Sequence, residues 1–178
     1  MATATGIEII ALEEHYWDTV ITDTFKGRNS TRRGPLLDRL YDLGELRLKE
    51  MDSAGIDIQV LSHGAPSAQR LDAETGPGLA KEANDKLYAT VQANPDRFAA
   101  FAALATAQPE SAADELERCV KELGFKGAMI HGLTNGKFCD GKEYWPIYAR
   151  AEALDVPVYL HPGFPHDDVV KAYYEDYL

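Results

Sequence analysis

The chain contains little cysteine and no long apolar run. Its 178 residues include two cysteines, Cys119 and Cys139, which do not form a CxxC pair. A disulfide framework and a thiolate zinc site are therefore not expected. No apolar run approaches the roughly 20 residues that cross a bilayer, and residues 1–6 lack the basic-then-apolar order of a signal peptide. We expect a cytoplasmic protein with two reduced thiols and no membrane partner.

Positive charge is also scarce. The 18 Lys and Arg residues are outnumbered by 29 Asp and Glu residues, which gives a formal net charge of -11. A nucleic-acid partner is not expected, because contacts to phosphates require clustered cations. With 45% hydrophobic residues, a chain of this length can still bury the core of one domain.

Apolar segments alternate with segments of helical periodicity along the whole sequence. We predict strands at residues 7–12, 56–61, 98–104, 127–130 and 156–160, and helices at 36–54, 79–93, 109–123 and 144–154. Strict alternation with largely apolar strands indicates a parallel sheet covered by helices. A doubly wound sheet would follow its first strand with a glycine-rich phosphate loop, whereas this sequence has Glu13-Glu14-His15 there. The predicted fold is therefore an α/β (β/α)8 TIM barrel.

The number of predicted strands does not reach that of a full barrel. A TIM barrel has eight strand–helix units and typically about 250 residues, and the predicted elements account for strands one to five. We interpret residues 1–178 as the N-terminal part of a single TIM-barrel domain that is truncated after strand five. Such a piece would leave edge strands unpaired.

The histidines follow the predicted strands. All five lie at or just after the carboxyl end of a strand, where a barrel places its active site: His15, His63, His131, His161 and His166. Glu13 is two residues before His15, so both side chains point to the same side of the strand. Imidazole and carboxylate groups are ligands of zinc and manganese. Because strands one and five face each other across a barrel mouth, His161 is predicted as the third ligand.

Several segments resemble a known family: Ala11-Leu12-Glu13-Glu14-His15, Leu46-Arg47-Leu48-Lys49-Glu50-Met51-Asp52-Ser53-Ala54-Gly55-Ile56-Asp57, Ala83-Asn84-Asp85, Pro95-Asp96-Arg97-Phe98, Leu123-Gly124-Phe125-Lys126-Gly127 and Tyr159-Leu160-His161-Pro162. The chain is similar to the amidohydrolase superfamily, in the branch of the γ-resorcylate, 5-carboxyvanillate and aminocarboxymuconate semialdehyde decarboxylases. The resemblance implies Zn²⁺ or Mn²⁺ held by Glu13, His15 and His161, with His161 also counted as catalytic. It further implies an Asp from strand eight and a His from strand six, neither of which lies within these residues.

The activity implied by the resemblance is non-oxidative, metal-dependent decarboxylation of a hydroxylated aromatic carboxylic acid by a homo-oligomer. A hydrolase acting on an amide or lactone, and a hydratase, use related barrels and metals. The Glu-x-His rather than His-x-His pattern at strand one favours the lyase. A third alternative is a non-catalytic half barrel with a vestigial site.

Other polar and aromatic residues near the strand ends are weaker candidates. His63 and His131 could line a substrate pocket or bind loop carbonyl groups, and relatives often have Asn at the position of His131. Trp17 and Phe25 could cover an aromatic substrate or pack the loop after strand one. A basic group, Arg28, Arg32 and Arg33, could attract a carboxylate, although such groups are usually only exposed. His166 is interpreted as a solvated loop residue.

Overall fold

A computed structural model describes residues 6–25, 34–163, 165 and 167–173. The strands β1 (Ile10–Tyr16), β2 (Ile58–His63) and β3 (Phe98–Ala100) form one sheet in that order. The strands β4 (Ala102–Ala103), β5 (Ala128–His131) and β6 (Val158–His161) form a second sheet, also in chain order. Every strand pair is parallel. This is the α/β arrangement predicted from the alternation, and it corresponds to part of a barrel.

The fold differs from the prediction where one strand, residues 98–104, was expected. It is divided at Phe101 into β3, which pairs with β2, and β4, which pairs with β5. The backbone stays hydrogen-bonded across the break, because the Phe101 amide donates to Leu61 O at 2.9 Å and the Ala102 amide donates to Gly127 O at 2.8 Å. The two short strands therefore occupy one strand position of the barrel, which leaves the predicted five positions.

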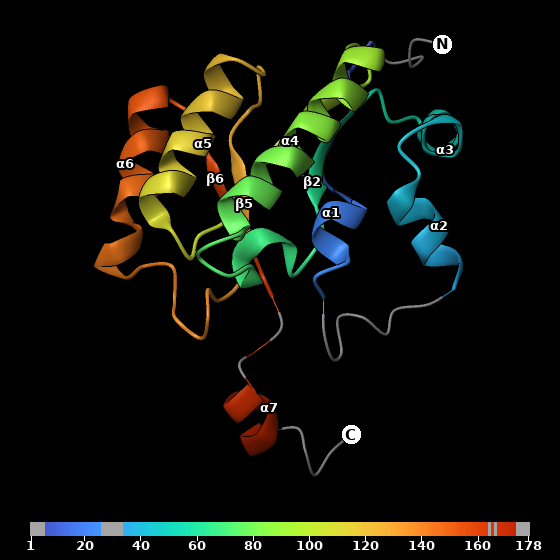
Figure 1. The fold of residues 1–178 in the computed structure, drawn as a ribbon. Coiled ribbons are helices and arrows are strands. Elements are labelled where there is room, and N and C mark those ends of the chain that lie inside the picture. Colours follow the sequence, from blue (N-terminus) through green and yellow to red (C-terminus); the bar gives the residue numbers. More distant parts are fainter. Residues whose placement is uncertain (1–5, 26–33, 164, 166, 174–178) are drawn as a thin grey trace.

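Three long helices cover one face of the strands (Figure 1). They are α4 (Gly76–Ala93), α5 (Pro109–Lys121) and α6 (Trp145–Leu154). Pro109 is the first residue of α5, as expected for a residue whose missing amide proton costs nothing at that position. The main apolar core lies between these helices and the strands and includes Leu61, Leu87, Leu116 and Ile147, each at most 1% exposed.

The predicted single helix over residues 36–54 is wrong. The chain forms α2 (Pro35–Tyr41) and α3 (Glu45–Ala54), which are separated at Asp42. The Asp42 carboxylate accepts hydrogen bonds from the amides of Gly44 and Arg47, at 3.0 and 3.1 Å. A side chain that binds free amides in this way starts a new helix instead of continuing the old one. Gly55 ends α3 in a left-handed conformation, with φ 71°, as predicted.

Four short helical segments were not predicted. They are α1 (Thr19–Thr22), α7 (Asp167–Tyr173) and two 3-10 turns, η2 (Ser67–Arg70) and η3 (Lys142–Tyr144). Asp18 caps α1, because its carboxylate accepts from the Val20 amide at 2.7 Å. The segment α7 lies away from the layer of long helices (Figure 1). None of the helices in the described ranges has the length and apolar character required to cross a membrane.

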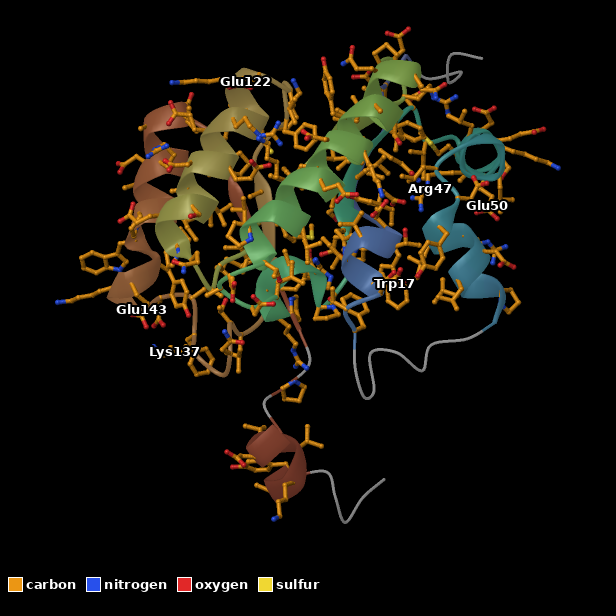
Figure 2. The ribbon with its side chains drawn as sticks, viewed as in Figure 1. Trp17, Arg47, Glu50, Glu122, Lys137 and Glu143 are labelled. Atoms are coloured by element: carbon orange, nitrogen blue, oxygen red, sulfur yellow. The ribbon has the colours of Figure 1, made fainter. Side chains whose placement is uncertain are left out.

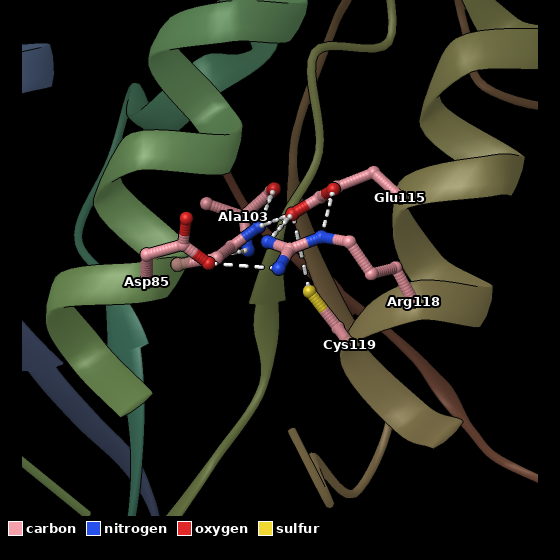
Figure 3. A network of polar contacts seen from close by, with 6 residues as sticks. Asp85, Ala103, Glu115, Arg118 and Cys119 are labelled. Atoms are coloured by element: carbon pink, nitrogen blue, oxygen red, sulfur yellow. Dashed lines mark hydrogen bonds and ion pairs between the residues drawn. The ribbon is translucent and has the colours of Figure 1, made fainter. Parts of the chain in front are cut away.

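A polar network joins α4, β4 and α5 (Figure 3). Asn84 donates to Ala103 O at 3.0 Å, and its own oxygen accepts from the Ala103 amide at 2.9 Å. Asn84 also donates to Glu115, which contacts Arg118 at 2.8 Å. Because the side chain of Asn84 is fully buried, these contacts satisfy polar groups that would otherwise be costly to bury. The network fixes the position of β4 against the helices.

The strands β5 and β6 approach each other closely at Gly127. This residue has φ 140°, and a Cβ atom added to it would lie 2.2 Å from Pro157 O. That distance is far below van der Waals contact, so only glycine fits without movement of the backbone.

Candidate metal centre

Four histidines lie at the carboxyl ends of the strands. His63, His131 and His161 are the last residues of β2, β5 and β6, and His15 is the last but one of β1. The predicted concentration of imidazoles at one rim of the sheets is confirmed for these four residues. His166 lies outside the described residues.

Three of the imidazoles form a compact cluster. The ring centroids of His15 and His161 are 4.8 Å apart, those of His131 and His161 are 4.8 Å apart, and those of His15 and His131 are 5.4 Å apart. The Nε2 atoms of His15 and His161 face each other at 3.3 Å. Two residues that are 146 positions apart in the sequence are thus in direct contact, as predicted for the ends of β1 and β6.

Two glycines bring β5 and β6 together at this point. A Cβ atom on Gly132 would lie 3.0 Å from the Cα atom of Gly163, and the Gly132 amide donates to His161 O at 3.0 Å. Backbone therefore packs against backbone directly after His131 and His161. This close approach places the two rings side by side.

Hydrogen bonds determine which ring nitrogens are available at the centre. His161 Nδ1 lies 2.6 Å from Pro162 O, and since a carbonyl group only accepts, the proton must be on Nδ1. In the neutral ring, Nε2 then carries a lone pair that points toward His15. His15 Nδ1 is 2.9 Å from Ser62 Oγ, a hydroxyl group that can donate or accept. Contacts of this kind orient histidine ligands in metal sites.

The separation of the two Nε2 atoms suits a shared ion. Two nitrogen ligands that are about 2.1 Å from one metal, at an angle of roughly 100°, lie about 3.2 Å apart. The pair of His15 and His161 therefore fits a divalent transition metal. Within the described ranges, however, no group of three His, Cys, Asp or Glu side chains is positioned to hold a metal ion.

Glu13 lies on the predicted side of β1 but has a different partner. Its carboxylate accepts from the hydroxyl group of Tyr159 on β6 at 2.6 Å. The strand carries an irregularity between Ala11 and Glu14, where one extra residue is accommodated opposite β2, and such bulges redirect side chains. The structure thus brings His15 and His161 together and places Glu13 beside Tyr159. The role of Glu13 as a metal ligand stays a prediction.

His131 is the buried member of the histidine cluster. It is 3% exposed, its Nε2 donates to His63 O at 2.8 Å, and its amide donates to Gln69 Oε1 at 3.2 Å. Burial lowers the pKa of His131 to about 3, with a further contribution from His15 and His161. Its Nδ1 atom has no hydrogen-bond partner among the described residues. A contact between His131 and substrate stays a prediction.

His63 has both ring nitrogens in use. Nδ1 donates to Gly64 O at 3.0 Å, and Nε2 accepts from the Asp18 amide at 3.2 Å. Burial lowers the pKa of His63 to about 4. These contacts connect the start of α1 to the end of β2. They correspond to the alternative in which His63 binds a loop carbonyl group. Because both ring nitrogens of His63 are hydrogen-bonded, the structure offers no support for its predicted contact with substrate.

The aromatic candidates lie at the same rim. Trp17 is 5% exposed, and its ring packs against Phe25 and Tyr41, with centroids 5.6 and 6.1 Å away. These contacts correspond to the alternative in which Trp17 packs the loop after strand one. Phe25 lines a pocket of about 550 Å³ together with residues of the loop after β2. Substrate contact by either aromatic residue stays a prediction, and the basic group Arg28, Arg32 and Arg33 lies outside the described residues.

Sequence reasoning missed the residues that support the cluster. Tyr159 precedes His161 by two positions in β6, so the period of the strand already places both side chains on one face. Ser62 could have been found in the same way from its position at the end of β2. No local signal marks Gln69, because its contact with the His131 amide arises from tertiary structure.

Parallel strands covered by helices, with an imidazole pair whose spacing suits a divalent metal at the carboxyl rim, correspond to about half of an α/β barrel. The amidohydrolase family model matches residues 13–173. The chain belongs to the amidohydrolase family.

Several relatives combine sequence and structural similarity. The γ-resorcylate decarboxylase of a Polaromonas species is 40% identical over 172 residues, covering 92% of this chain and 53% of that protein. The structure of 5-carboxyvanillate decarboxylase from Novosphingobium aromaticivorans, with manganese and 4-hydroxy-3-methoxy-5-nitrobenzoic acid, has a TM-score of 0.90 at 34% identity, covering 97% of this chain and 55% of that one.

A third relative is the dihydroxybenzoic acid decarboxylase of a Polaromonas species, crystallised with manganese and the inhibitor 2-nitroresorcinol. It has a TM-score of 0.84 at 39% identity, covering 93% of this chain and 52% of that chain. The chain thus spans about half the length of the relatives that it matches.

Proposed function

We propose that this chain supplies the metal-binding half of a manganese-dependent, non-oxidative decarboxylase that acts on a hydroxylated aromatic carboxylic acid. The observation that carries the proposal is the contact between His15 and His161, whose Nε2 atoms lie 3.3 Å apart at the ends of β1 and β6. Relatives that are 34–40% identical decarboxylate acids of this class, and two of them were crystallised with manganese.

The proposed ligands are His15 and His161, with Glu13 as the third. A metal held by these residues would supply a Lewis acid that stabilises negative charge on the substrate. The proton that replaces CO₂ on the ring would come from the strand-eight Asp implied by the family resemblance, which lies outside these residues. The carbonyl group of Pro162 keeps the proton of His161 on Nδ1, so that Nε2 remains a ligand. Tyr159 holds the Glu13 carboxylate on the same face.

Binding of a coloured inhibitor tests the proposal directly. The full chain would be loaded with Mn²⁺ and titrated with 2-nitroresorcinol, while CO₂ release is measured with γ-resorcylate and 5-carboxyvanillate beside an amide and a lactone. We expect Mn²⁺-dependent inhibitor binding by this half of the barrel, with CO₂ release from an aromatic acid where the residues implied for strands six and eight are also supplied. Turnover of the amide or lactone instead would favour a hydrolase. Absence of both metal retention and inhibitor binding would refute the proposal and leave the half barrel without a catalytic role.

A pair of carboxylate variants separates ligation from general charge. Glu13→Ala should reduce Mn²⁺ retention, since it removes a ligand. Glu143→Ala removes another carboxylate, which contacts Lys137 at 3.1 Å and lies on η3. The second variant should retain Mn²⁺ like the unaltered chain. Equal retention in both variants would remove Glu13 from the ligand set.

We further propose a cytoplasmic location and self-association, with zinc as the alternative metal. The free thiols of Cys119 and Cys139 suit a reducing compartment. The large apolar side chains of Ile10, Leu12 and Leu160 are about half exposed on β1 and β6, which favours contact with further polypeptide. Light scattering of the purified protein would measure the mass of the assembly.

A further inference from the structure

Arg47 is a buried cation on the opposite side of β1 from the imidazole cluster. It belongs to α3, is 8% exposed, and lies between that helix and the strands (Figure 2). Its guanidinium group donates to three backbone carbonyl groups, those of Asp42 at 2.9 Å, Arg39 at 2.9 Å and His15 at 2.9 Å. A cation with this many fixed contacts is a rigid anchor for the segments that it joins.

The contact with His15 O lies on the side of β1 that faces away from β2. The next carbonyl group along β1, that of Tyr16, accepts from the Gly64 amide beyond the end of β2 at 2.9 Å. Successive carbonyl groups of a strand point to opposite sides, so that of His15 points away from β2. In the described structure β1 pairs only with β2. Arg47 therefore binds β1 on the side that faces away from β2, at the residue whose side chain enters the cluster.

A second series of hydrogen bonds connects Arg47 to Glu14, the residue before His15. Arg47 Nη1 donates to Gln59 Oε1 at 3.2 Å, and Gln59 Nε2 donates to the Glu14 carboxylate at 2.7 Å. The side chain of Glu14 and the carbonyl group of His15 are thus held from one guanidinium group. Both lie just after the irregularity in β1, where regular pairing alone does not fix the backbone.

The geometry points to Arg47 as a positioning residue for His15: by holding the His15 carbonyl group from the helix side, it sets the approach of the His15 ring to His161. This inference rests on the proposed function for its metal readout, but the contact between the two rings exists without metal. Lysine cannot substitute, because a single ammonium group does not reproduce the planar fork that reaches these acceptors.

Arg97 provides a matched control at the other end of the sheet. Its guanidinium group donates to Asp57 O at 2.9 Å and Ile56 O at 3.2 Å, and it contacts Asp52 at 2.8 Å. It therefore also holds backbone carbonyl groups, but those before the amino end of β2. Arg97→Lys should weaken the fold without affecting the cluster.

The experiment compares Arg47→Lys with Arg97→Lys in the full chain. In the metal-free protein, nuclear Overhauser contacts between the His15 and His161 ring protons report their approach. In a Mn²⁺ titration, electron paramagnetic resonance of free Mn²⁺ gives the dissociation constant. We expect Arg47→Lys to lose the ring contact and to weaken Mn²⁺ binding about tenfold, the usual effect of removing a group that orients a ligand. Arg97→Lys should preserve both.

Unchanged ring contacts in Arg47→Lys would overturn the inference. The proposed function and the inference can fail separately. If the unaltered chain binds no Mn²⁺, but the ring contact is lost in Arg47→Lys and kept in Arg97→Lys, the proposed function is refuted and the inference stands. If Arg47→Lys does not fold, Gln59→Met removes one acceptor of Arg47 and releases Glu14. That variant should weaken the same ring contact, and an unaltered contact would count equally against the inference.

Discussion

His63 should make the stability of this protein depend on pH in a defined window. The folded structure requires a neutral ring, because Nε2 accepts from the Asp18 amide and Nδ1 donates to Gly64 O. Burial lowers the pKa of His63 from 6.5 to about 4. The unfolded chain therefore binds one more proton than the folded chain between these values, and stability falls as the pH decreases from 6.5 toward 4.

The magnitude follows from the linkage relation. Each pKa unit corresponds to about 1.4 kcal/mol, and at pH 5 the unfolded chain is already largely protonated at His63 while the folded chain is not. The loss of unfolding free energy between pH 7.5 and pH 5 that arises from His63 is then about 2 kcal/mol. Above pH 7 the contribution of His63 to the pH dependence should vanish.

Urea unfolding at a series of pH values measures this effect. Trp17 is a suitable fluorescent probe, because it is 5% exposed whereas Trp145 is 55% exposed. A chelator keeps the protein free of metal, so that pH-dependent metal binding does not add to the measured pH dependence of stability. His63→Gln keeps an acceptor for the Asp18 amide but does not titrate. Its pH dependence should be shallower by about one proton per molecule, and identical slopes for the two chains would refute the assignment of a buried neutral His63.

Three further predictions concern packing. Asn84→Ala should lower the free energy of unfolding by about 3 kcal/mol, measured in urea, because the Ala103 amide and carbonyl group lose their partner; a loss below about 1 kcal/mol would contradict this. Gly127→Ala should lower the melting temperature by several degrees in circular dichroism, since the new Cβ meets Pro157 O; an unchanged value would mean that the backbone yields freely. Cys119 should react with a thiol reagent only after unfolding, because it is buried and burial raises its pKa; labelling of the folded protein at this residue would argue against the packing of α5.

The parts of the fold that follow from local periodicity were predictable. The order of strands and helices, the helix start at Pro109 and the stop at Gly55 all depend on nearby residues. Four of the five predicted strands end one to four residues later than predicted, at Tyr16 instead of residue 12 in β1. The exception is the strand predicted at residues 98–104, whose second part, β4, ends at Ala103. The division of the helix at Asp42 was missed, although Asp42 and Gly44 are both weak helix formers.

The candidate site was predictable to the extent that it depends on strand ends. The convergence of His15 and His161 follows from parallel strands whose carboxyl ends share one rim. The partner of Glu13 was not predictable, because it depends on the irregularity in β1 and on the hydroxyl group of Tyr159. The functions of Arg47 and Gln69 come from contacts between distant segments, which leave no periodic trace in the sequence.

The contact between Gly132 and Gly163 has a consequence for how this rim tolerates sequence change. Since main chain touches main chain there, no side chain separates the segments that follow His131 and His161. Their distance is therefore set by backbone contact. An added methyl group at either glycine would force these two segments apart, and with them the histidines that precede them.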